Sequence, residues 1–196
     1  MRRVVLSGLH GALLPIPAIA GVAEKPPAAA KVLDLFQRLK TAQQNGATAG
    51  RVSFQLSEQE VNEYPVYSQH AHPRPGLDSM TMKFFSGNYI STFTVMDFDA
   101  IERWKPGTIP MLLKPALNGK KSVWVDARFE ASGGKTTFSI EKAYFNNIRL
   151  PAYVAQKAIE VVAARQPEHY DATKPVPLPF GLRSIWTTDQ EVGGEN

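Results

Sequence analysis

Two pairs of long segments rich in aromatic, methionine and β-branched residues occupy the middle of the chain. They cover residues 77–86 and 88–98, and residues 120–132 and 135–150. Short glycine turns separate the members of each pair, at Gly87 in the first and at Gly133-Gly134 in the second, which is typical of β-hairpins. Two long hairpins must bury one of their faces, so we expect an α+β domain around a long antiparallel sheet.

The second hairpin has one apolar and one polar face. Val123, Val125, Ala127 and Phe129 alternate with polar or amphipathic neighbours. In the following strand the apolar positions shift by one residue between Ile140 and Ala143, which predicts a β-bulge.

The first 23 residues have the pattern of a secretory signal peptide. Arg2-Arg3 precedes an uncharged run over residues 4–20 that ends in small residues, and cleavage before Gly21 or before Glu24 fits the small-x-small rule. An uncleaved membrane anchor is the alternative, but the run contains two prolines and is shorter than the about 20 apolar residues of a spanning helix. We expect a periplasmic or secreted protein that is soluble after cleavage.

Composition excludes several function classes. Two of the 22 basic residues lie in the signal peptide, so the mature chain has 20 basic and 18 acidic residues and a net charge of only +2. Its cations are scattered, whereas nucleic-acid binding needs a basic stripe. The chain has no cysteine, which removes disulfides, thiolate chemistry and a lipoprotein linkage. We expect no nucleic-acid partner.

The remaining elements complete one domain. Residues 24–50 are predicted to form a linker and an amphipathic helix over 31–44, and residues 51–196 a single domain with 31–50. Within it we expect a strand over 51–56, a last strand over 182–192, and an apolar helix from Pro151 to Arg165. Ser57 and Glu60 form a capping box for a helix that Pro65 is predicted to end or kink.

Catalytic and metal motifs are missing from the sequence. His70 and His72 are close in sequence but have no third ligand nearby, so we expect no metal site and no cofactor. The carboxylates Asp97, Asp99 and Glu102 suit acid–base chemistry, but they lie where a helix is predicted to begin, and helix starts favour acidic residues. We expect no enzymatic activity.

Three short motifs resemble those of the small, single-lobed bacterial members of the tubular lipid-binding (TULIP-like) superfamily. They are the strand-to-helix junction at residues 54–62, the sequence over residues 145–151 that ends in Leu150-Pro151, and Leu178-Pro179-Phe180-Gly181-Leu182. The similarity runs from Arg51 to Val192. It implies a strongly curved antiparallel sheet wrapped as a half-barrel around an apolar helix, with a groove for lipid tails and no catalytic residues.

Together these observations predict a protein that binds or carries a lipid or another apolar molecule. The lining we expect is apolar and comes from three predicted strands and one predicted helix: Met80, Met82, Phe84, Val125, Phe129, Phe138, Val154 and Ile159. One alternative is a cell-envelope interaction module with a packed core, which docks a protein through a sheet edge or the Trp104 region. Another is an enzyme on a cystatin-like cone, which requires a polar pocket.

Overall fold

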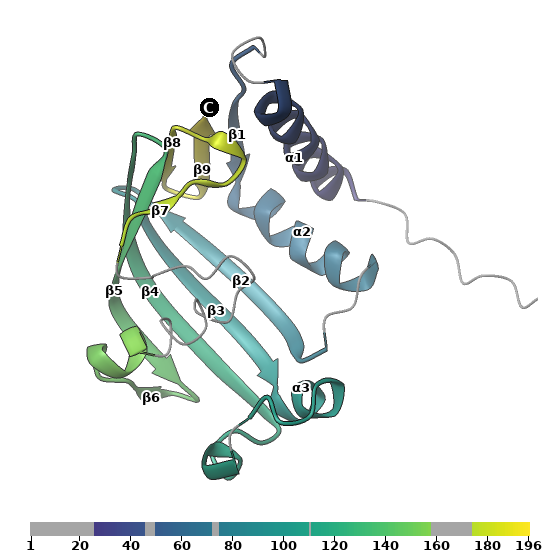
Figure 1. Cartoon of the computed structure of the whole chain (residues 1–196), viewed down its shortest axis with the longest axis vertical. Helices are drawn as coiled ribbons and strands as arrows, with labels where there is room; N and C mark the ends of the chain where they lie inside the picture. The colour runs from purple at the N-terminus through teal and green to yellow at the C-terminus, as the bar shows by residue number, and fades with distance from the viewer. Residues whose placement is uncertain (1–25, 46–49, 72–74, 110, 158–173) are drawn as a thin grey trace, which may run out of the picture.

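The computed structural model of the 196-residue chain describes residues 26–45, 50–71, 75–109, 111–157 and 174–196. The predicted signal peptide, residues 1–23, lies outside these ranges. The protein has an α+β fold with two antiparallel sheets, one of six strands and one of three (Figure 1). No helix within the described ranges is long and apolar enough to cross a membrane.

The six-stranded sheet contains both predicted hairpins. Its strands follow the order β2-β3-β4-β5-β6, and β7 pairs with β5 beyond the end of β6. Their bounds are β2 Leu77–Phe85, β3 Tyr89–Asp97, β4 Lys120–Ser132, β5 Lys135–Phe145, β6 Ile148–Arg149 and β7 Val176–Pro177. The sheet is not strongly curled.

Both hairpin turns and the predicted bulge are confirmed. Gly133 and Gly134 have positive φ angles of 60° and 78°, as a tight hairpin turn with right-handed strand twist requires. Asp126 pairs with Lys142 and Ala127 pairs with Ile140, so Glu141 is the extra residue of the bulge in β5.

The three-stranded sheet has the order β1-β9-β8. Its strands are β1 Ser53–Ser57, β8 Ser184–Thr188 and β9 Glu191–Glu195. The prediction of one last strand over 182–192 is therefore wrong, because the chain turns back between β8 and β9. Gln190 takes the positive φ of 65° that glycine usually takes at such a turn. The sequence between β8 and β9 therefore lacks the glycine that would have predicted a turn.

Glycines in β9 let large side chains pack on this small sheet. A Cβ atom on Gly193 would lie 2.6 Å from the Trp186 ring, and one on Gly194 would lie 2.7 Å from the Phe54 ring. The two aromatic rings therefore take the space that side chains of β9 would fill.

The main hydrophobic core joins helix α1 Pro27–Asn45 to the three-stranded sheet. The predicted amphipathic helix is confirmed, although it begins four residues earlier than expected, inside the predicted linker. Its apolar side chains pack against those of β1, of the residue just before β1 and of the segment before β8. The buried members of this core are Val32, Leu35, Leu39, Ala42, Val52, Leu56, Leu178 and Leu182.

Helix α2 Glu58–Ala71 follows β1 directly through the predicted capping box. The Glu60 amide donates to the Ser57 hydroxyl at 3.2 Å, and the Ser57 amide donates to the Glu60 carboxylate at 2.8 Å. Pro65 was predicted to end or kink the helix, and the first of these alternatives is wrong, because the helix continues through Pro65 to Ala71. Side chains that bind the helix to β2 offset the hydrogen bond that Pro65 removes.

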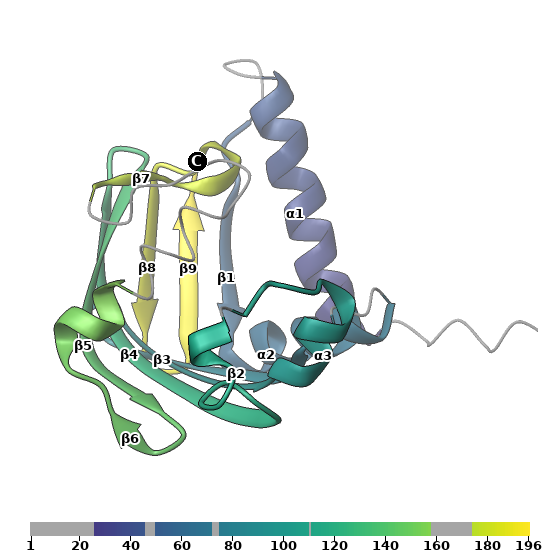
Figure 2. The same ribbon diagram turned by 60° about the horizontal axis from the view of Figure 1, so that its bottom comes forward.

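The two sheets meet near one end of the large sheet, and short helices lie at the other. Figure 2 shows β1, β9 and β8 rising from the large sheet. Helix α3 Phe98–Trp104 and the 3-10 turn η2 Met111–Leu113 connect β3 to β4 at the opposite end. A second 3-10 turn, η3 Pro179–Gly181, follows β7. Residues 152–157 are helical after Pro151, and the rest of the predicted apolar helix lies outside the described residues.

Candidate apolar-ligand site

The inner face of the large sheet carries the apolar positions predicted from alternation. Phe84 in β2 pairs with Ile90 in β3, and Phe129 in β4 pairs with Phe138 in β5. The rings of Phe129 and Phe138 lie 6.2 Å apart between centroids, with their planes tilted by 46°. Register thus brings aromatic rings from adjacent strands together on one face.

A cavity of about 480 Å³ lies where this face meets the three-stranded sheet. Strands β2 to β5 of the large sheet contribute five residues, and the other walls come from β7 of the same sheet, from η3 with the residue before it, and from β8 and β9. The lining consists of Phe84, Ile90, Phe129, Thr136, Phe138, Val176, Pro177, Leu178, Pro179, Ile185, Thr187 and Val192. Ten of these twelve side chains are apolar, so the cavity suits an apolar ligand.

Exposure differs sharply across the lining. Phe84 and Phe129 are each 5% exposed, whereas Phe138 is 54% exposed. Phe84 and Phe129 therefore form the wall of the cavity, and Phe138 lies at its opening. A large aromatic side chain that remains half in water gains free energy when an apolar ligand covers it.

Two threonines are the polar members of the lining, and their hydroxyls differ. The Thr187 hydroxyl donates to the Phe85 carbonyl oxygen at 2.7 Å, and the Thr187 amide donates to the Asn88 side-chain oxygen at 3.0 Å. The buried Thr136 hydroxyl has no hydrogen-bond partner among the described residues. Satisfied hydroxyls are the rule in protein interiors, so Thr136 is the unusual one.

The structure brings three of the eight predicted lining residues into this cavity: Phe84, Phe129 and Phe138. Met82 and Val125 lie on the same sheet face one row further along, since both pair with Thr92 of β3. Met80 lines a separate cavity of about 580 Å³ beside α2. Val154 is half-buried in the helical segment 152–157, and Ile159 lies outside the described residues.

Sequence reasoning missed the walls contributed by the C-terminal part of the chain. Val176, Ile185 and Val192 lie in short strands that no sequence pattern connects to the large sheet. Ile90 was missed because the β3 sequence is mixed on both faces, although its pairing with Phe84 places it inward. Ile185 and Thr187, two residues apart in a predicted strand, share one strand face, but nothing in that spacing marks the face as a cavity wall.

Two of the three carboxylates considered for catalysis, Asp97 and Glu102, accept hydrogen bonds from backbone amides. Asp97 is the N-cap of α3, where its carboxylate accepts from the Ala100 amide at 2.9 Å. Glu102 accepts from the amides of Gly107 and Ile109 at 3.0 and 3.1 Å, and its carboxylate lies 2.8 Å from the Lys114 ammonium group. These contacts lower the pKa of Glu102 to about 2, with the Lys114 hydrogen bond as the largest cause. Both side chains therefore organise the segment after β3.

His70 is exposed near the end of α2, and His72 lies outside the described residues. Within the part of the chain that the structure describes, no three metal-binding side chains lie together.

The fold and the cavity define an α+β protein with an apolar site at the junction of two antiparallel sheets. No protein-family model, curated protein or solved structure matches the chain.

Proposed function

We propose that this protein is exported to the cell envelope, where it binds or carries a lipid or another apolar molecule without catalysing a reaction. The observation that carries the proposal is the cavity of about 480 Å³ with its largely apolar lining. Its volume is within the range of about 300–1,000 Å³ that is usual for ligand sites.

The shape of the site supports an elongated apolar ligand. Met82 and Val125 continue the apolar face beyond the cavity, and both remain only half-buried within the described structure. An alkyl chain lying along this row would remove apolar surface from water at a gain of about 25 cal/mol per Å². The family resemblance implies that the sheet forms a half-barrel around the helix after Pro151, and we include this arrangement in the proposal.

The test compares one variant inside the cavity with one outside it. Ile185→Trp replaces a branched alkyl side chain with a bulky indole ring in the cavity, whereas Val154→Trp changes a half-buried residue that does not line it. We expect wild-type protein to bind an apolar fluorescent probe and to release lipid on extraction. Ile185→Trp should lose probe binding and keep its circular dichroism spectrum, and Val154→Trp should keep binding.

Two outcomes would overturn the proposal. Wild-type protein that neither binds the probe nor yields lipid by native mass spectrometry would remove its basis. Probe binding that survives Ile185→Trp would place the ligand elsewhere.

Export is tested by determining the N-terminus of the purified protein. Protein purified from a cell-envelope extract should begin at Gly21 or Glu24, the two predicted cleavage products. Recovery of the uncut chain in the membrane fraction would contradict a soluble periplasmic protein.

A protein-interaction module is the second candidate, and the outer sheet face favours it. Phe93 and Trp124 are 43% and 44% exposed on that face and pair across adjacent strands. The β2 edge of the sheet is a poorer docking surface for a protein, because side chains of α2 already form hydrogen bonds with its backbone. An envelope protein that binds wild type and Ile185→Trp but not Phe93→Ser would support this role.

A further inference from the structure

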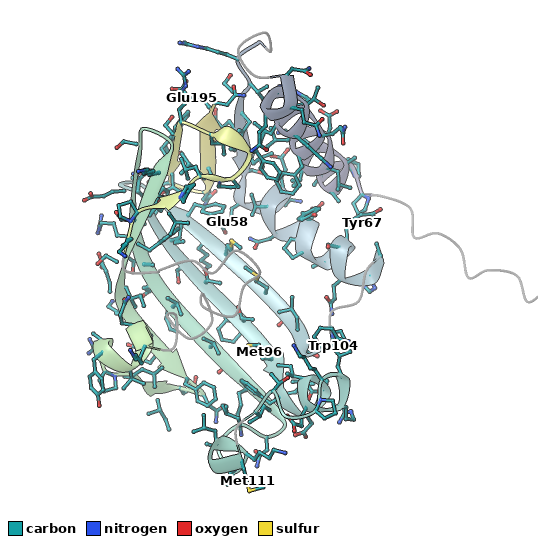
Figure 3. All side chains as sticks on the ribbon, viewed as in Figure 1. Glu58, Tyr67, Met96, Trp104, Met111 and Glu195 are labelled. Carbon is teal, nitrogen blue, oxygen red and sulfur yellow. The ribbon has the colours of Figure 1, made fainter. Side chains whose placement is uncertain are left out.

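The connection between β3 and β4 exposes large apolar side chains. Trp104 is 67% exposed, Met111 is 83% exposed and Leu113 is 48% exposed. Figure 3 shows Trp104 and Met111 toward the end of the molecule opposite Glu195. Their exposed surface lies away from the cavity, which is beside β8 and β9.

This segment is held in place by its own hydrogen bonds. The Glu102 carboxylate accepts from the amides of Gly107 and Ile109 and pairs with Lys114. Ile109, between Trp104 and Met111, is 6% exposed. The apolar side chains are therefore presented by a segment that is anchored through Glu102 and through the packed side chain of Ile109.

The same segment is basic. From Arg103 to Lys121 the sequence has five basic residues and no acidic residue. Arg103 and Lys105 are exposed on either side of Trp104. Lys114 and Lys120 pair with Glu102 and Asp78, and the chain as a whole has a nearly balanced charge. The exposed positive charge next to Trp104 thus comes from Arg103 and Lys105, and the exposed Asp99 lies one turn earlier in α3.

We infer that the surface formed by Arg103, Trp104, Lys105, Met111 and Leu113 docks onto an anionic lipid bilayer. Tryptophan prefers the membrane–water interface, and arginine and lysine beside it contact lipid phosphates. Stable attachment needs two signals, such as apolar insertion together with a basic patch, and this surface has both.

The chemistry favours a bilayer over a protein partner. Tryptophan, methionine and arginine are also enriched at protein interfaces, so Lys105 makes the difference: lysine is depleted there, whereas each basic side chain near an anionic membrane strengthens binding by about fivefold. The docking surface and the cavity rest on separate observations, so docking does not depend on the proposed ligand binding.

Co-sedimentation of the mature chain with vesicles tests the inference. We expect binding to vesicles of phosphatidylcholine mixed with phosphatidylglycerol, weaker binding to phosphatidylcholine alone, and a fall of the first to the level of the second at high salt. Trp104→Ser combined with Met111→Ser should weaken binding by roughly tenfold or more, because both apolar contacts are lost. Arg103→Gln combined with Lys105→Gln should reduce binding to the anionic vesicles and leave the weak binding to phosphatidylcholine unchanged.

Matched controls lie elsewhere on the surface. Val66→Ser removes an exposed apolar residue of α2, and Lys135→Gln removes an exposed cation at the β4–β5 turn. Both should bind vesicles like wild type, and the Trp104 and Met111 double variant should still bind the apolar probe if the cavity is a ligand site. Equal vesicle binding by this double variant and wild type, or no binding to anionic vesicles, would overturn the inference. A protein bound through Trp104 without any vesicle binding would also overturn it.

Discussion

Asn62 of α2 forms two hydrogen bonds with the backbone of Met82 in β2. Its side-chain nitrogen donates to the Met82 carbonyl oxygen at 2.7 Å, and its side-chain oxygen accepts from the Met82 amide at 2.7 Å. On either side, Glu58 accepts from the Phe84 amide and Gln69 donates to the Leu77 carbonyl oxygen. The helix therefore pairs with an edge strand that could otherwise recruit another chain.

Asn62→Ala should destabilise the protein and expose this edge. Loss of the side chain leaves the Met82 amide and carbonyl without their partners, at a cost of about 1–3 kcal/mol in the free energy of unfolding. Urea denaturation measures the loss, and light scattering should show more self-association. Gln59→Ala on the same helix is the control, because the exposed Gln59 side chain donates to Glu63 one turn further along the helix. Equal stability of the two variants would show that Asn62 does not hold the edge.

The capping box at Ser57 should make stability depend on pH. Lys31 donates to the Glu60 carboxylate, and this hydrogen bond is the largest cause of a lowered Glu60 pKa. A carboxyl whose pKa is lower in the folded state stabilises the protein above its unfolded-state pKa, and the stabilisation is lost as pH falls through the folded pKa.

Glu60→Gln should therefore be less stable than wild type at neutral pH, and the difference should shrink in acid. Denaturant titrations at several pH values measure it, with Glu63→Gln one turn further along α2 as the control. A difference that stays constant from neutral pH into acid would exclude the ion pair as its origin.

Local patterns in the sequence predicted the large sheet well. The turn at Gly133-Gly134 and the shifted apolar positions around Glu141 depend on neighbouring residues, and both are confirmed. The capping box also depends on residues close in sequence, and it was predicted. The length of α2 was not predicted, because Asn62 and Gln69 stabilise the helix through hydrogen bonds to β2, a strand that comes later in the chain.

The candidate site shows the same limit. Alternation identified Phe84, Phe129 and Phe138, since each belongs to a long strand with one apolar face. The opposite wall depends on the packing of β8 against β2 and β4, contacts between residues far apart in sequence. Ile185 therefore has no local pattern that marks it as a lining residue.

Thr136→Val should preserve or increase stability and strengthen probe binding. The Thr136 hydroxyl is buried without a partner among the described residues, and an unsatisfied polar group costs about 1–3 kcal/mol. Valine has nearly the same shape, so the substitution removes the polar atom and leaves the cavity volume unchanged. Thr187→Val is the contrasting variant and should be destabilised, because it breaks the hydrogen bond to Phe85. Thermal unfolding and probe titration compare the two, and a Thr136→Val variant less stable than Thr187→Val would contradict the assignment.

The Glu102 contacts should survive to low pH. Hydrogen bonds from Lys114, Gly107 and Ile109 lower the Glu102 pKa to about 2, so the carboxylate stays charged while ordinary carboxyl groups become protonated. Its contribution to stability is fully present above the unfolded-state pKa and is lost as pH falls through about 2.

The Glu102 carboxyl carbon should accordingly titrate near pH 2 by nuclear magnetic resonance, and the amides of Gly107 and Ile109 should stay protected from hydrogen exchange until then. Lys114→Gln removes the largest cause of the shift and should move the titration upward, whereas Lys135→Gln should not. Titration of Glu102 at the usual carboxyl pKa in wild-type protein would show that the segment carrying Trp104 and Met111 is not anchored in this way.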